Sequence, residues 1–144
     1  MTQTAKRVPP RHRTLRVVHR LAAVPTTRRA LVADLHSIGV APEVVDEAGI
    51  VVSELLGNAM KHAVALPDGR VRVHWQVKSG VVELDVTDGG GGAAPRPQQP
   101  ADYATAGRGL RVVRSLGHEW GVVDDERGRT VWATVGGPSR RRRI

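Results

Sequence analysis

The sequence contains no cysteine and no phenylalanine, and three tryptophans and one tyrosine supply all of its aromatic rings. The absence of cysteine excludes disulfide bonds, thiolate metal ligands and thiol nucleophiles, so any catalysis must use oxygen or nitrogen groups. No apolar run approaches the roughly 20 residues of a membrane-spanning helix, and the first residues lack the apolar core of a signal peptide. We therefore expect a cytoplasmic protein with no membrane partner.

The charge of the chain is concentrated at its two ends. The formal net charge is +8, but residues 1–20 and 140–143 hold ten of the basic residues and no acidic one, which leaves residues 21–139 mildly acidic. Like charges repel one another and stay solvated, so we interpret 1–20 as a basic, flexible leader and 138–144 as a basic tail. Residues 21–137 then form one folded domain. Because nucleic-acid recognition requires basic residues on folded elements and aromatic rings for stacking, nucleic acid is not expected as a partner.

The spacing of apolar residues predicts two helices in the first half of the chain. The first covers residues 26–38, with Thr26 or Thr27 as its N-cap. The second covers residues 42–63, since Pro42 suits a first turn and acidic residues follow it. Polar side chains gather along one edge of the apolar stripe of this second helix, namely Glu47, Glu54, Asn58 and Lys61.

Alternation of apolar and polar residues predicts four strands, at residues 71–77, 81–88, 119–123 and 130–135. The same period of two turns the side chain of Asp88 toward the core. Between the strand pairs, residues 89–106 predict a long loop that could act as a lid, and residues 110–116 predict a short helix. This order of elements predicts an α+β fold with a mostly antiparallel sheet and its helices packed on one face.

Glu54 and Asn58 form the first cluster of chemical interest. They lie one helical turn apart, so a carboxylate and an amide point to the same side of the helix. An amide oxygen is a neutral, hard ligand that suits Mg²⁺, and Glu54 is then placed to accept a proton from a hydroxyl that attacks a phosphate. Taken alone, such a pair is more often an ordinary exposed helix edge, because this spacing is common.

Two glycine-containing segments offer complementary chemistry. Asp88 precedes a run of four glycines; an inward carboxylate can accept a hydrogen bond from an amino group such as that of adenine, and glycine lets the backbone approach a flat ring. Residues 107–110, G-R-G-L, open a predicted helix whose free N–H groups suit phosphate oxygens, and Arg108 adds charge. Each segment alone is also compatible with an ordinary turn or hinge.

Taken together and in order, four segments resemble the N, G1, G2 and final threonine boxes of the GHKL superfamily: E-L-L-G-N-A-M-K-H-A at 54–63, D-G-G-G-G at 88–92, G-R-G-L at 107–110 and G-R-T at 128–130. This superfamily includes gyrase B, the heat-shock chaperone ATPases and the histidine kinases. The resemblance covers about residues 26–136. It implies a two-layer α/β sandwich of the Bergerat (HATPase) type that binds ATP and Mg²⁺.

The resemblance also implies a role for each matching residue. Glu54 is the expected general base, Asn58 the expected Mg²⁺ ligand, and Asp88 the expected acceptor for the adenine amino group. The remaining expected contacts to the nucleotide are Lys61 and His62 facing phosphate, Gly90 and Gly92 beside the base, Gly107, Arg108, Gly109 and Leu110 at the phosphates, and Thr130 near the adenine.

The small size and the lack of a phospho-acceptor domain look most like the anti-sigma-factor serine/threonine kinases and related regulatory ATP-binding proteins of actinomycetes. This implies a regulator of transcription that phosphorylates an anti-sigma-factor antagonist and holds a sigma factor, and it is compatible with a homodimer. The alternative is a non-catalytic module in which ATP orders the loop at 89–106 to present a partner surface. Thr105 stands where the fuller second glycine box often has a glycine, which favours that alternative.

Overall fold

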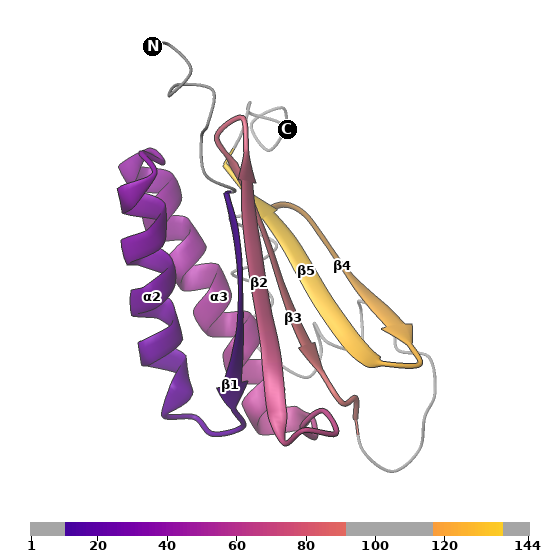
Figure 1. Cartoon of the computed structure of the whole chain (residues 1–144). Coiled ribbons are helices and arrows are strands. Elements are labelled where there is room, and N and C mark those ends of the chain that lie inside the picture. The colour runs from indigo at the N-terminus through magenta and orange to yellow at the C-terminus, as the bar shows by residue number, and fades with distance from the viewer. Residues whose placement is uncertain (1–10, 92–116, 137–144) are drawn as a thin grey trace, which may run out of the picture.

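The computed structural model describes residues 11–91 and 117–136 (Figure 1). The described elements, in chain order, are β1 (His12–Val18), α2 (Ala23–Ser37), α3 (Pro42–His62), β2 (Arg70–Lys78), β3 (Val81–Asp88), β4 (Gly117–Asp125) and β5 (Gly128–Val135). No helix among the described residues combines the length and apolar character needed to cross a membrane.

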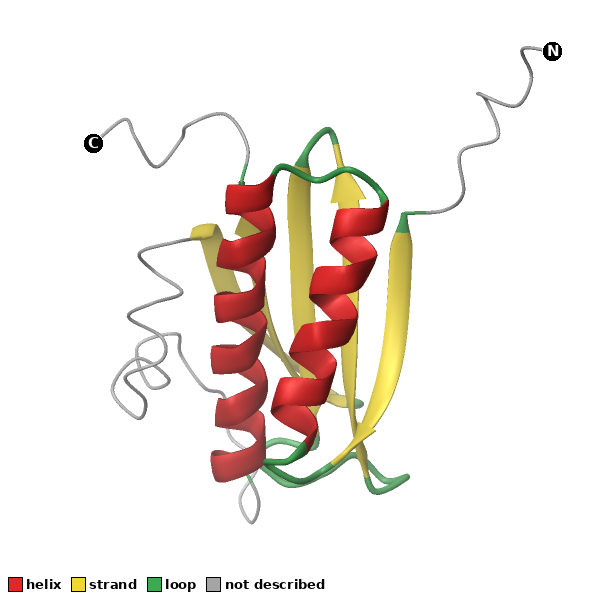
Figure 2. Cartoon of the chain, turned by 90° about the vertical axis from the view of Figure 1, so that its left-hand side faces the viewer, coloured by secondary structure: helices red, strands yellow, loops and turns green. Residues whose placement is uncertain are grey.

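The strands form one five-stranded sheet in the order β1-β2-β3-β5-β4, and every neighbouring pair is antiparallel. Helices α2 and α3 lie side by side on one face of this sheet (Figure 2). Among the described residues, no helix covers the opposite face. The predicted α+β architecture, with an antiparallel sheet and helices on one face, is confirmed.

The core lies between the helices and the sheet, and its pattern follows from the sequence. Alternate residues of β2 are buried, so one face of the strand meets the helices and the other does not. At the centre of β2, Trp75 is completely buried, and its Nε1 donates a hydrogen bond to Oδ2 of Asp34 on α2 at 2.7 Å. On α3 the buried residues recur at helical spacing and include Val51, Val52 and Leu55.

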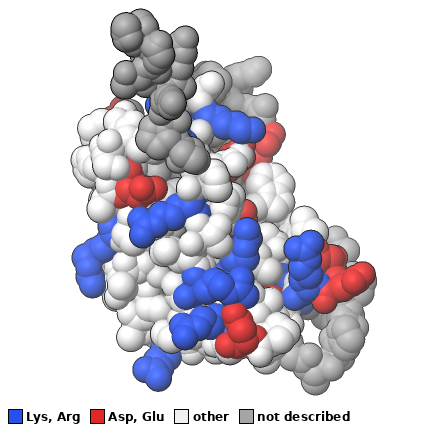
Figure 3. All heavy atoms as spheres, viewed as in Figure 1, with Lys and Arg blue, Asp and Glu red and all other residues white. Residues whose placement is uncertain are grey.

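The prediction of a flexible leader over residues 1–20 is wrong for residues 12–18, because these form β1 at the edge of the sheet. Leu15 and Val17 pack against the core. On the other side of the strand, Arg16 forms an ion pair with Asp68, with Nε and Oδ2 2.8 Å apart. Basic and acidic side chains are neighbours on this side of the molecule (Figure 3). Charged residues are characteristic of edge strands, because they discourage pairing with another chain.

The helix boundaries agree with the predictions to within a few residues. Helix α3 ends at His62, one residue before the predicted end. Helix α2 begins at Ala23 rather than at residue 26, and no side chain caps it. Pro25 is accepted in the first turn, since N–H groups there have no partner within the helix. The predicted helix at 110–116 and the loop beyond Gly91 lie outside the described residues.

Candidate functional site

The C-terminal ends of α3 and β3 are joined by backbone hydrogen bonds. The N–H of Val64 donates to the carbonyl of Gly90 at 2.9 Å, and the N–H of Gly89 donates to the carbonyl of Val64 at 2.8 Å. A Cβ at Gly89 would clash with the carbonyl oxygen of Ala65, so only glycine fits this close approach. The end of the helix that carries the predicted catalytic pair is thereby fixed beside the end of the strand that carries Asp88.

Asn58 is a buried residue whose amide nitrogen has no hydrogen-bond partner among the described residues. Its side chain is only 9% exposed, and Nδ2 has no hydrogen-bond partner within the described part of the chain. Leaving a buried polar atom unsatisfied costs about 1–3 kcal/mol, and native proteins retain such atoms mostly where a ligand or water completes them. Rotation of the amide by 180° brings its oxygen to the same place. Asn58 is therefore suited to receive a ligand.

Glu54 precedes Asn58 by one turn of α3 and is half-buried. No hydrogen bond or ion pair joins its carboxylate to another described residue. Lys61 and His62 are exposed in the last turn of the helix, where positive charge complements the helix dipole. A second imidazole, that of His19, also lies at this end, with Nε2 3.2 Å from the carbonyl oxygen of Ala59. His19 belongs to none of the four segments that resemble the GHKL boxes.

Asp88 faces the helices, as the alternation of β3 predicts, and is 1% exposed. Its Oδ1 accepts a hydrogen bond of 2.7 Å from the N–H of Gly90. Burial raises the pKa of this carboxyl to about 6, although the bond from Gly90 and the positive charge of Arg129 oppose the increase. Gly90 has φ +96°, and no atom of the described residues lies within 4 Å of the position that a Cβ would take. A buried acceptor thus stands next to open space.

Thr130 lies on the other face of the sheet from Asp88. In the register between β3 and β5, Thr130 is opposite Thr87, and their hydroxyls are 2.7 Å apart. Both side chains point to the sheet face that the helices leave uncovered, because successive residues of a strand alternate between faces. There they line a hollow of about 560 Å³ together with Arg16 and Arg72.

Arg129, the neighbour of Thr130, is the residue of β5 that faces the core beside Asp88. It is opposite Asp88 in the register, is only 7% exposed, and donates from Nε to Oδ1 of Asp124 at 2.9 Å. A signal for it was available: Val131, Ala133 and Val135 face the core, so the same period of two turns Arg129 inward.

The other predicted contacts, at Gly92, Gly107, Arg108, Gly109 and Leu110, lie outside the described residues. The structure therefore brings Glu54 and Asn58 to the same end of the fold as Asp88 and Gly90, with Lys61 and His62 at the rim. Thr130 alone among the described candidates lies on another face.

Comparison with known proteins agrees with this fold. Residues 17–135 match the model of the family described as "Histidine kinase-like ATPase domain". The chain belongs to this family. Among solved structures, it is similar to the RsbU and RsbW domains of Rv1364c from Mycobacterium tuberculosis, with a TM-score of 0.68 and 22% identity over 92% of the present chain. The chain spans 34% of that longer protein, and the likeness supports the fold. No curated protein sequence matches closely enough to add to this comparison.

Membership of the histidine kinase-like ATPase family implies ATP as the ligand of this site. The family resemblance also implies Mg²⁺, and the residues present fit it. Within residues 11–91 and 117–136, no group of three or more His, Cys, Asp or Glu side chains could hold a metal. Mg²⁺ instead commonly takes one or two protein oxygens and completes its shell with phosphates and water. Asn58 offers one such oxygen if its amide is turned so that the oxygen takes the place of the unpartnered Nδ2.

Proposed function

We propose that this protein binds ATP with Mg²⁺ at the joined ends of α3 and β3, and transfers the terminal phosphate to a serine or threonine hydroxyl of a protein partner. The partner is an anti-sigma-factor antagonist, which makes the protein a cytoplasmic regulator of transcription that also holds a sigma factor. The observation that carries the proposal is the buried side chain of Asn58, whose Nδ2 has no hydrogen-bond partner in the described chain and which lies one helical turn from Glu54.

Each residue has a defined task in this proposal. Asp88 accepts a hydrogen bond from the amino group of adenine, and the open space at Gly90 receives the ring. Asn58 provides an oxygen ligand for Mg²⁺, which when bound neutralises charge on the phosphates. Lys61 and His62, exposed at the end of α3, face the phosphates.

Transfer requires a base, and Glu54 is the candidate. The hydroxyl oxygen of the partner forms a bond to phosphorus, the bond from phosphorus to the ADP oxygen breaks, and the proton of the hydroxyl passes to the Glu54 carboxylate. The absence of a hydrogen bond or ion pair from Glu54 to other described residues supports this role, because its oxygens remain available as acceptors.

The kind of partner is supported by two observations. The ordered boxes resemble those of anti-sigma-factor kinases, and the fold is similar to a chain that contains an RsbW domain. The same resemblance is compatible with a homodimer. The test is incubation of the protein with labelled ATP and candidate antagonists.

The Glu54→Gln variant should bind ATP and leave the antagonist unlabelled. The matched control is Glu43→Gln, which makes the same change at an exposed position in the first turn of the same helix and should label as the wild type does. Labelling that persists in Glu54→Gln would rule out Glu54 as the base.

The second candidate function is a non-catalytic module whose partner binding depends on ATP. Thr105, in place of a glycine in the second glycine box, favours this candidate because it alters the segment expected at the phosphates. Calorimetry that detects ATP binding, combined with no transfer to any antagonist and no hydrolysis, would select it over the kinase.

A further inference from the structure

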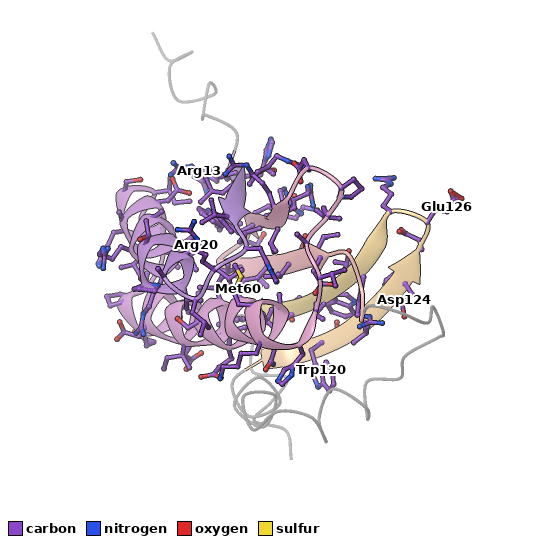
Figure 4. The ribbon with its side chains drawn as sticks, turned by 90° about the horizontal axis from the view of Figure 1, so that it is seen from below. Arg13, Arg20, Met60, Trp120, Asp124 and Glu126 are labelled. Carbon is purple, nitrogen blue, oxygen red and sulfur yellow. The ribbon has the colours of Figure 1, made fainter. Side chains whose placement is uncertain are left out.

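Three charged side chains form a row across adjacent strands at the nucleotide end of the sheet. Arg129 on β5 is opposite Asp88 of β3 on one side and opposite Asp124 of β4 on the other. Residues directly opposite one another in antiparallel strands share a face, and here it is the face that meets the helices. Figure 4 shows that Asp124 and Trp120 point to the same side of β4, whereas Glu126 projects from the turn. The row is therefore acid, base, acid.

Arg129 is held firmly at the centre of this row. Its side chain is 8% exposed, and Nε donates to Oδ1 of Asp124. The terminal nitrogens of the guanidinium lie under the glycine turn: a Cβ at Gly91 would be 3.4 Å from Nη1 and 3.7 Å from Nη2. The buried positive charge of Arg129 therefore lies beside both the carboxyl of Asp88 and the glycine turn that follows it.

The proposed function gives Arg129 no task, although burying a guanidinium is unfavourable unless its charge is compensated. The carboxyl of Asp88 experiences three charged neighbours, which are Arg129 from β5, Asp124 from β4 and His19 from the segment between β1 and α2. Burial and Asp124 raise its pKa, whereas the hydrogen bond from Gly90, Arg129 and His19 lower it, and the balance is about 6.

The protonation state of Asp88 decides which base it accepts. An ionised carboxylate is only an acceptor, and it matches the 6-amino group of adenine. A protonated carboxyl carries one O–H donor, and it matches the 6-oxo group of hypoxanthine instead. With a pKa near 6, the group changes between these states just below neutral pH, so a nearby positive charge has a large effect on base preference.

We propose that Arg129 is a specificity-determining positioning residue, which keeps Asp88 in its ionised, acceptor-only form and so makes the site select a 6-amino purine over a 6-oxo purine at neutral pH. The proposal rests on the proposed function, because it assumes that Asp88 contacts the base. Arg129 acts through Asp88 and need not touch the nucleotide.

The experiment measures dissociation constants of the full-length protein for ATP and inosine triphosphate between pH 5.5 and 8.5, with Mg²⁺ present. For the wild type, the ratio of the two constants should favour ATP by about tenfold or more at pH 8. This preference for ATP should decrease as the pH is lowered, and the midpoint of the decrease should lie near pH 6.

Two variants should move this midpoint in opposite directions. Arg129→Gln removes the positive charge and should raise the midpoint above the wild-type value. Asp124→Asn removes a negative charge and should lower it below the wild-type value. Arg129→Lys retains the charge and should stay near the wild type. The matched control is Arg127→Gln, the same substitution at an exposed position of the same hairpin, which should leave the midpoint unchanged.

The outcomes separate this inference from the function on which it rests. If the wild type binds neither nucleotide, the proposed function fails. If the wild type binds ATP but Arg129→Gln moves the midpoint no further than Arg127→Gln, the inference alone fails. An equal loss of affinity for both nucleotides at an unchanged midpoint would show a merely structural role and also overturn it. Should Arg129→Gln not fold, the midpoint of Asp124→Asn decides: a downward shift supports the inference, and no shift rejects it.

Discussion

Replacement of Asp88 by asparagine should stabilise the protein without its ligand. Burial raises the pKa of Asp88 from its ordinary value of 3.8 to about 6, so the folded state binds the proton more tightly than the unfolded state does. The stabilisation that the protonated Asp88 carboxyl adds to the free energy of unfolding is therefore largest below pH 4, and it is lost as the pH rises from 4 to 6. A change of about two pH units corresponds to about 3 kcal/mol. Asparagine has no charge to bury and avoids this loss.

The assay is urea unfolding at several pH values between 4 and 8, for the wild type, Asp88→Asn and Asp46→Asn. The last variant is a matched control, because Asp46 is exposed on α3. At pH 4 the Asp88→Asn variant and the wild type should be similarly stable. At pH 7.5 the variant should be more stable by about 3 kcal/mol, which is about 10 °C in Tm. It should also bind ATP more weakly, since the amide can donate as well as accept.

A stability difference that is the same at pH 4 and pH 7.5 would refute this reasoning, because it would show that the charge of Asp88 carries no penalty in the fold. A dependence on pH that also occurs in Asp46→Asn would assign the effect to the net charge of the protein rather than to burial.

Further substitutions test other parts of the structure. Gly89→Ala should destabilise the protein by about 1–3 kcal/mol in urea unfolding, because the new Cβ meets the backbone of Ala65. Gly57→Ala should instead stabilise α3 by about 0.5–1 kcal/mol, because no atom of the described residues lies within 4 Å of its Cβ. A stabilising Gly89→Ala and a destabilising Gly57→Ala would contradict the described packing. Thr130→Val should cost about 1 kcal/mol through the lost bond to Thr87 and leave the ATP dissociation constant within about twofold. A large loss of ATP affinity in Thr130→Val would return Thr130 to the nucleotide site.

Much of the fold could be predicted because periodicity is strong where one side of an element is buried. The stripe of α3 and the alternation in β2 and β3 each indicated a single buried face, and the inward position of Asp88 followed from the same alternation. Strand β1 was missed because the six basic residues of 1–20, two of them in the strand itself, predicted a solvated leader. Only two residues of this edge strand, Leu15 and Val17, pack on the core, and a pattern so short is easily outweighed by charge.

In the site, too, relations within one helix could be predicted from the sequence, whereas relations between strands could not. Glu54 and Asn58 belong to one helix, so their relation depends only on helical geometry. The row of Asp88, Arg129 and Asp124 depends on the register of three strands, which no local pattern specifies. The motif G-R-T predicted a role for Thr130, whereas the alternation of β5 turns its neighbour Arg129 toward the core.

The most direct test of the account is a titration of the protein with ATP, with and without Mg²⁺, for the wild type and Asn58→Ala. The account predicts that Mg²⁺ strengthens ATP binding by the wild type and that this effect of the metal disappears in Asn58→Ala. An equal effect of Mg²⁺ on both proteins would contradict the assignment of the buried amide as the metal ligand, and no binding of ATP by the wild type would contradict the site itself.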